Sequence, residues 1–142
     1  AGVPLGLVVA DLDDFTAFNA ARGRHEGDRA LRRAADALRD SFQRAGEVSA
    51  RLGEDSFATL LPATDSADVQ RAAERAREAI ESLAVDHPSS DTADRVTASV
   101  GMAVHLPRGG EGAEALLSTA MAGLEESRKA GGNLVGSPLA EE

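Results

Sequence analysis

A single apolar run constrains the fold of this chain more than any other feature. Residues 5–10, LGLVVA, are continuously apolar over the length of a strand, which is the pattern of a strand buried on both faces. Such a strand must have packing layers on both sides of its sheet. The run ends on Asp11, so a carboxylate is predicted at the carboxyl end of the strand.

Amphipathic helices are predicted further along the chain. Apolar residues recur at helical spacing within residues 30–42, 69–83 and 113–124. Asp28 is a suitable N-cap for the first of these helices, and Asp65 or Ser66 for the second. Gly131-Gly132 stops the third.

A β-hairpin and a further strand complete the pattern. Residues 48–52 and 57–61 are short apolar stretches on either side of the sequence GEDS at 53–56, which indicates two strands joined by an acidic turn. Residues 96–104 have the β-branched residues and the length of a strand. The order strand, helix, helix, hairpin, helix, strand, helix predicts an α/β (α+β) sandwich with a central mixed β-sheet flanked by helices.

The length of 142 residues fits one domain with a single core. We expect this domain to cover residues 1–135, followed by a flexible acidic tail at 136–142. Because the chain does not begin with Met and starts almost directly in a strand, we expect it to be part of a longer protein.

Composition and charge exclude several classes of function. A formal net charge of −9 disfavours binding of a nucleic-acid polymer, which needs a basic face. There is no cysteine and there are only three scattered histidines, so a metal would be held by oxygen, as Mg²⁺ or Ca²⁺ is. No apolar run approaches the ~20 residues of a membrane span. Without a visible signal peptide either, we expect a cytoplasmic domain with no membrane insertion.

Two acidic positions are candidates for a shared site. Asp11 at the strand end and Asp55 in the hairpin turn converge if the two strands are neighbours in the sheet. Magnesium commonly takes one or two carboxylates together with substrate phosphates, so this pair predicts a Mg²⁺-phosphate site. Acidic residues at strand ends and in turns are also common for turn chemistry and solubility, and the pattern alone leaves both interpretations open.

A set of motifs runs in order along nearly the whole chain. It comprises DLDDF at 11–15, Asn19 with Gly23 and GD at 27–28, RLGEDSF at 51–57, VTASVG at 96–101 and GGN at 131–133. In order and spacing these motifs resemble the GGDEF family, the diguanylate cyclase domain, with GEDSF in place of GGDEF. The resemblance implies a nucleotidyl cyclase-like fold with a palm-type, ferredoxin-like core and the signature motif on a hairpin.

The resemblance also implies a function and a site. Members of the family condense two GTP into cyclic di-GMP, each subunit of a dimer supplying one GTP, with two Mg²⁺ ions assisting. Asp11, the Leu12 carbonyl and Asp55 match the metal-binding and catalytic positions. Asn19 and Asp28 match the positions that bind guanine, although an ordinary polar helix residue and an N-cap are the alternatives for these two.

Two further positions are carried over from the family. Arg128 replaces a lysine that contacts phosphate, and an arginine can still reach one. Arg44 and Glu47 resemble the R-x-x-D inhibitory site, with Glu instead of Asp. The alternative for this pair is a helix-terminal arginine and a loop glutamate.

The chain departs from the family pattern within the signature motif, which here reads Gly53, Glu54, Asp55, Ser56 and Phe57. Glu54 replaces the second glycine, and Ser56 replaces the glutamate, whose role as a strong metal ligand or base a hydroxyl cannot take over.

Two basic phosphate contacts of the family are also absent, because Thr16 and Gly132 stand where the family has Lys and Arg. Each lost charged contact to phosphate costs about 1.5–3 kcal/mol if the phosphate is desolvated.

These departures predict a degenerate, catalytically inactive GGDEF domain that serves as a regulatory or dimerisation module of cyclic di-GMP signalling. GTP or cyclic di-GMP is the expected ligand, with Mg²⁺ only if nucleotide is bound, and a homodimer or other domains of a longer protein are the expected partners. One alternative is a weakly active diguanylate cyclase in which Glu54 replaces the missing carboxylate. Another is a scaffold that binds no nucleotide.

Overall fold

The fold is built on one mixed β-sheet, seen in a computed structural model that describes residues 3–42, 47–106 and 113–136. Within these ranges the strands are β1 (Leu5–Leu12), β2 (Val48–Arg51), β3 (Ser56–Pro62), β4 (Ala98–His105) and β5 (Val135–Gly136). Their spatial order is β2-β3-β1-β4-β5. The pairs β2–β3, β3–β1 and β1–β4 are antiparallel, whereas β5 runs parallel to β4. The predicted central mixed sheet is confirmed.

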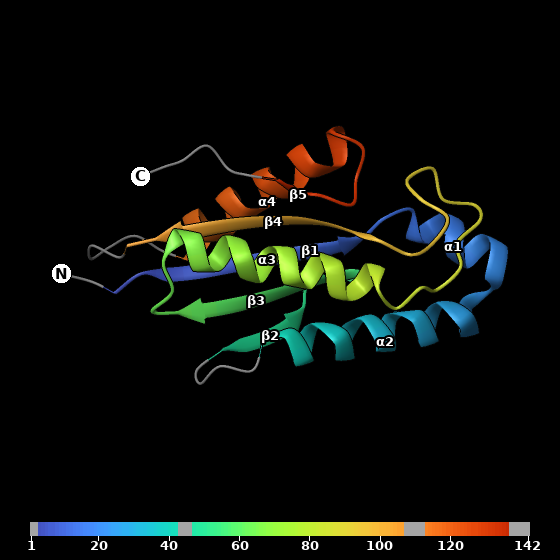
Figure 1. Ribbon diagram of the computed structural model, residues 1–142, viewed down its shortest axis with the longest axis horizontal. Helices are drawn as coiled ribbons and strands as arrows, with labels where there is room; N and C mark the ends of the chain where they lie inside the picture. The colour runs from blue at the N-terminus through green and yellow to red at the C-terminus, as the bar shows by residue number, and fades with distance from the viewer. Residues whose placement is uncertain (1–2, 43–46, 107–112, 137–142) are drawn as a thin grey trace.

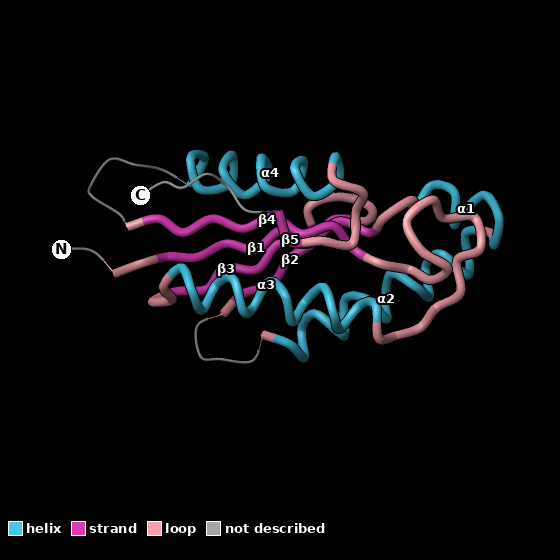
Figure 2. Tube along the Cα trace, turned by 45° about the horizontal axis from the view of Figure 1, so that its top comes forward, coloured by secondary structure: helices cyan, strands magenta, loops and turns pink. Residues whose placement is uncertain are grey.

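Helices cover both faces of this sheet. They are α1 (Phe15–Arg22), α2 (Arg24–Ser41), α3 (Ser66–Glu81) and α4 (Ala113–Lys129). Figure 2 shows α4 on one side of the strands and α2 and α3 on the other. Helix α1 lies beyond the carboxyl end of β1, as Figure 1 shows.

Strand β1 supplies side chains to both layers, as its continuous apolar run predicts. Leu7 and Val9 pack with Leu124 and other residues of α4, whereas Val8 and Ala10 belong to the larger core with α2 and α3. These alternating positions follow from the two-residue period of a strand. The alternation places Asp11 on the same face as Leu7 and Val9, the face that α4 covers.

Close packing of α4 on β4 depends on Gly101. A Cβ added at this residue would lie 2.9 Å from the Leu124 Cα and closer still to the Ala120 carbonyl oxygen. Both neighbours are backbone atoms, so they cannot move aside as a flexible side chain would. The glycine of the VTASVG motif is therefore required by helix–sheet packing.

The prediction that Asp28 caps a helix is wrong. Helix α2 begins at Arg24 after Gly23, whose φ of 90° breaks the chain between α1 and α2. Asp28 therefore lies inside α2, where its side chain is exposed. Asp65, by contrast, is the N-cap of α3, since its carboxylate accepts a hydrogen bond of 2.9 Å from the Asp68 N–H.

Strand β5 was not predicted, because two residues are too few to form a sequence pattern. Gly136, placed by the sequence in the acidic tail, pairs with Gly101 in this strand. Residues 137–142 of the predicted tail lie outside the described residues.

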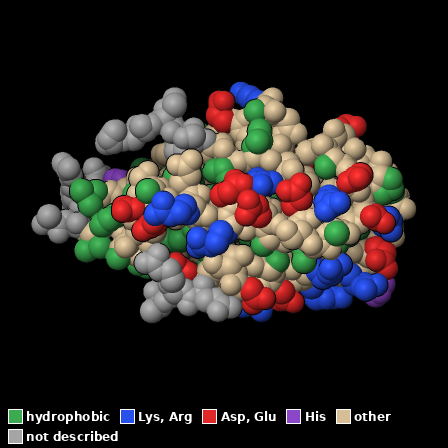
Figure 3. All heavy atoms as spheres, in the orientation of Figure 1, with side chains coloured by type: hydrophobic (Ala, Val, Ile, Leu, Met, Phe, Trp, Pro, Cys, Tyr) green, Lys and Arg blue, Asp and Glu red, His purple; other side chains and the backbone are tan. Residues whose placement is uncertain are grey.

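Charged side chains of both signs alternate on the face formed by α2 and α3 (Figure 3). Pairs one helical turn apart account for part of this pattern, including Arg39 with Asp36 at 2.8 Å. Exposed pairs of this kind contribute little to stability. No helix in the described part of the chain combines the length and apolar character needed to cross a membrane.

Candidate functional site

The end of β1 brings two of the predicted acidic positions together. Asp11 is paired with Ser56 of β3 and with Ser99 of β4, so it lies between two neighbouring strands. The Leu12 N–H donates to the Asp55 carbonyl at 3.1 Å, which holds the hairpin turn against the end of β1. The predicted neighbourhood of Asp11, Leu12 and Asp55 is thus present.

The Asp11 carboxylate has protein partners on both of its oxygens. Arg128, in the last turn of α4, forms an ion pair with Oδ2. The Ser56 hydroxyl donates to Oδ1 at 3.3 Å. The Asp11 side chain is only 10% exposed, and a carboxylate so enclosed requires partners of this kind.

The hairpin turn is closed by backbone and arginine contacts. The Leu52 N–H donates to the Ser56 carbonyl at 2.8 Å. Arg51 donates to the Glu54 carbonyl, and its guanidinium carbon lies 5.8 Å from the centre of the Phe57 ring. Glu54 is exposed. The turn is therefore held by its own residues, with the Glu54 side chain directed away from the core.

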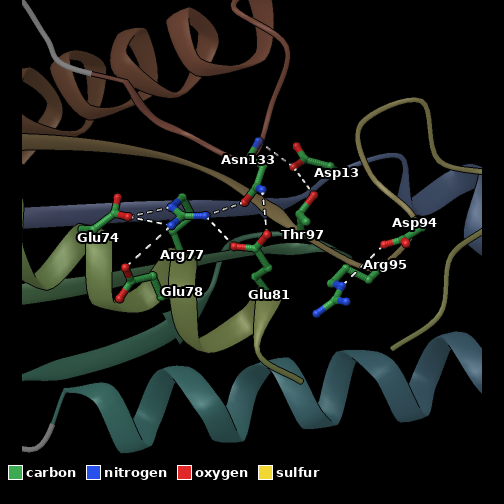
Figure 4. Close-up of polar contacts among 9 residues, drawn as sticks. All are labelled: Asp13, Glu74, Arg77, Glu78, Glu81, Asp94, Arg95, Thr97 and Asn133. Atoms are coloured by element: carbon green, nitrogen blue, oxygen red, sulfur yellow. Dashed lines mark hydrogen bonds and ion pairs between the residues drawn. The ribbon is translucent and has the colours of Figure 1, made fainter. Parts of the chain in front are cut away.

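A second carboxylate, Asp13, fastens the loop after α4 to the sheet. Its Oδ2 accepts from Thr97 Oγ1 at 2.8 Å and from the Asn133 N–H at 3.0 Å (Figure 4). Ser99 donates to its Oδ1 at 2.6 Å. The motifs DLDDF and GGN contain Asp13 and Asn133, but the sequence does not indicate this role for them. The alternation of Thr97 and Ser99, which places both hydroxyls on one face of the strand, is the sequence signal for this contact.

Arg77 of α3 holds Asn133 from the other side. Its guanidinium donates to Asn133 Oδ1 at 2.9 Å, to Glu81 at 2.8 Å and to Glu74 at 2.6 Å (Figure 4). The hydrogen bonds to Glu74, followed by those to Glu81, raise the pKa of Arg77 above its usual range despite burial. The loop that follows Arg128 is thus anchored to both β4 and α3.

Asp14 ties the loop at residues 90–92 to the start of α1. Burial of its carboxylate opposes ionisation, but hydrogen bonds from Ser90 and Thr92 and from the Asp91 N–H lower the pKa of Asp14 below its ordinary value of 3.8. The donor distances are 2.8 Å from Ser90, 3.1 Å from Thr92 and 3.1 Å from Asp91. This carboxylate has a positioning role that the sequence did not reveal.

The two predicted guanine positions lie at the junction of α1 and α2. A Cβ added at Gly27 would lie 2.9 Å from Asn19 Cγ and closer still to Oδ1, so the Asn19 side chain rests against α2 at Gly27, one residue before Asp28. The Asn19 Oδ1 is buried and has no hydrogen-bond partner among the described residues. A buried acceptor without a donor is unfavourable, and a ligand N–H would satisfy it.

Comparison with known proteins identifies the family. The model of the diguanylate cyclase GGDEF domain matches residues 1–134. The chain belongs to the GGDEF family. The family resemblance and the cyclase-like α/β fold expected from the sequence are confirmed.

Curated GGDEF relatives and a solved structure agree with this assignment. The chain is 34% identical over 127 residues to the bifunctional diguanylate cyclase/cyclic di-GMP phosphodiesterase MucR of Pseudomonas aeruginosa, covering 89% of this chain and 18% of MucR. It is 32% identical over 136 residues to the diguanylate cyclase VdcA of Vibrio cholerae, covering 95% of this chain and 39% of VdcA. It therefore spans less than half the length of either relative.

The solved GGDEF domain of DgcB from Caulobacter crescentus, in complex with c-di-GMP, matches with a TM-score of 0.82 and 27% identity. The match covers 94% of this chain and 77% of the DgcB chain.

GGDEF cyclases generally use Mg²⁺, but the residues at Asp11 do not fit that ion as they are arranged. Both oxygens of the carboxylate are engaged, one by a guanidinium and one by a hydroxyl donor. Within the described residues, no group of three or more acidic, histidine or cysteine side chains is gathered that could hold a metal ion.

The structure describes one residue of the predicted inhibitory pair. Arg44 lies outside the described residues, and Glu47 directly precedes β2. A role for Arg44 and Glu47 in binding cyclic di-GMP stays a prediction.

Proposed function

We propose that this GGDEF domain is catalytically inactive and acts as a regulatory or dimerisation module of cyclic di-GMP signalling in the cytoplasm. The observation that carries the proposal is the engagement of Asp11 by Arg128 and Ser56. Where the family motif has a glutamate, Ser56 supplies a neutral donor to the acidic position. The cluster of carboxylates that the cyclase reaction requires is thereby reduced.

The guanine end of the site supports retained nucleotide binding. Asn19 presents a buried acceptor against α2 at Gly27, and the next residue, Asp28, is exposed and able to accept from ligand N–H groups. Binding of the GTP phosphates is expected to be weaker, because Arg128 is already paired with Asp11. We therefore propose weak binding of GTP through its base, without turnover.

Calorimetry with GTP in Mg²⁺ tests this proposal. We expect measurable heat that weakens in Asn19→Ala and in Asp28→Ala. Asp40→Ala serves as the matched control, since it removes the same charge from an exposed position near the other end of α2. Equal affinities in all four proteins would contradict a guanine site at Asn19 and Asp28.

Gly27→Ala probes the same candidate guanine site without removing a polar group. The added methyl occupies the space of the Asn19 side chain, so we expect GTP binding to weaken as it does in Asn19→Ala. Helix stability should not fall, because alanine is favoured over glycine in a helix interior by roughly 0.5–1 kcal/mol. Unchanged GTP affinity in Gly27→Ala would show that Asn19 does not contact the base.

Turnover decides whether the domain is inactive. The chain is fused to a dimerising coiled coil, incubated with GTP and Mg²⁺ or Mn²⁺, and assayed by chromatography for cyclic di-GMP. We expect no product. Product that disappears in Asp55→Ala would instead establish a weak diguanylate cyclase.

A titration with cyclic di-GMP distinguishes the remaining roles. Heat that is lost in Arg44→Ala would support a receptor role, for which the DgcB complex with c-di-GMP is the precedent. No heat with either nucleotide would leave a scaffold that contacts other domains or a second copy.

A further inference from the structure

We propose that the guanidinium of Arg128 takes the place of a divalent cation on the Asp11 carboxylate, so that this domain holds no metal ion there. The inference deepens the proposed function and rests on it for the location of the site. Arg128 is the group that neutralises the Asp11 carboxylate at the end of β1.

Burial makes a partner for Asp11 obligatory. Among the described residues, Asp11 is the one acidic residue in the buried class, with a relative exposure of 7%. An enclosed carboxylate must be paired or bound to a cation, since a lone buried charge is strongly unfavourable. Arg128 supplies the positive charge through its ion pair with Asp11 Oδ2. Ser56 supplies a hydrogen-bond donor to Oδ1.

Arg128 is held in place by the end of α4. The hydroxyl of its neighbour Ser127 is buried and donates to the Leu134 carbonyl at 2.7 Å. The Gly132 N–H donates to the Ser127 carbonyl at 2.9 Å. A cation at a helix C-terminus is also favoured by the helix dipole. These contacts fix the backbone that carries Arg128 beside Asp11, and the Arg128 side chain itself is 43% exposed.

The ion pair leaves no free negative charge on the Asp11 carboxylate for a divalent ion. Arg128 neutralises Asp11, and Glu125 lies 3.6 Å from the Arg128 Nη1 on the other side of the guanidinium. An ion binding to the Asp11 carboxylate would be repelled by the guanidinium that is paired with it. Because arginine remains protonated at all ordinary pH values, this repulsion cannot be relieved by loss of a proton.

Binding of Mn²⁺ to the full chain, without nucleotide, tests the inference. Free Mn²⁺ is followed by electron paramagnetic resonance at concentrations up to about 1 mM, the weak end of calcium sites in proteins. We expect the wild-type chain to leave the free Mn²⁺ signal unchanged. We expect the double variant Ser56→Glu with Arg128→Gln to take up one Mn²⁺ per chain.

A charge-matched variant controls for net charge. Ser56→Glu with Lys129→Gln changes the charge of the chain by the same amount but leaves Arg128 on Asp11, and it should behave as the wild type does. Equal uptake by the two double variants would overturn the inference, as would no uptake by a folded Arg128→Gln double variant.

Mn²⁺ binding to the wild-type chain and to Asp11→Asn tests the inference independently of the double variants. Uptake of Mn²⁺ by the wild type that is lost in Asp11→Asn would overturn the inference even if a double variant failed to fold, which circular dichroism would detect. Because no nucleotide is present, failure here is distinguishable from failure of GTP binding in calorimetry.

Discussion

Asp14 shows how one carboxylate can hold a segment that has no regular structure of its own. Its backbone is in the left-handed region with φ of 53°, which asparagine and aspartate tolerate better than other side chains. Its carbonyl accepts from the Phe18 N–H at 3.1 Å at the start of α1 and lies 2.9 Å from His87 Nε2. The residue therefore joins α1 to the loop at 87–94.

Replacement of Asp14 by asparagine should make stability less dependent on pH. The pKa of Asp14 is lowered on folding, so its contribution is complete above the ordinary value of 3.8 and is lost as the pH falls through the lower folded value. We expect Asp14→Asn to lower the free energy of unfolding by about 1 kcal/mol at pH 7.

Urea unfolding at several pH values checks this prediction. The difference between wild type and Asp14→Asn should shrink below pH 3.8. Asp91→Asn is the control, because the Asp91 side chain is exposed in the same loop. A difference between wild type and Asp14→Asn that stays constant down to acid pH would contradict the assignment.

At the scale of elements, the contact between α4 and β4 fixes the position of Arg128. Gly101 on β4 allows the backbone of α4 to approach closely, and Ala120 and Leu124 are completely or nearly buried at the contact. The last turn of the same helix carries Arg128, which pairs with Asp11. Any shift of α4 away from β4 should therefore move Arg128 as well.

Gly101→Ala should destabilise the domain by about 1–3 kcal/mol or more, because the new methyl would overlap backbone atoms of α4. Chemical denaturation measures the loss. Gly53→Ala is the control, since a Cβ there meets only the Ser56 Oγ at 4.0 Å. Similar losses in both variants would show that close packing is not the cause.

At the scale of the whole molecule, β1 joins the two cores into one cooperative unit. Ile80 is completely buried in the core on one face of the sheet, and Leu124 is nearly so in the core on the other. Alternate residues of β1 contact each core, so neither layer can separate without exposing this strand.

Ile80→Ala and Leu124→Ala should each lower the free energy of unfolding by about 2–5 kcal/mol, as expected for large-to-small core changes. Both variants should still unfold in one transition, with equal calorimetric and van't Hoff enthalpies. Calorimetry checks this. Two transitions in the Leu124→Ala variant would mean that α4 and its core form a separate unit.

The sequence by itself determined the mixed sheet, the helical layers, the hairpin and the family. These features follow from local periodicity and from motifs that extend along the chain, and the apolar run of β1 already required burial on both faces. It also placed Asp55 near Asp11, because a strand end and a hairpin turn meet when their strands are neighbours.

Only the tertiary structure decided what the site residues contact. Asp28 was expected as an N-cap but lies inside α2, because Gly23 starts the helix earlier. Arg128 was expected to face phosphate, yet it is paired with Asp11, a residue 117 positions away in sequence. Such pairings depend on which side chains the packing of α4 on the sheet brings together. Local sequence patterns do not predict contacts between residues so far apart in the chain.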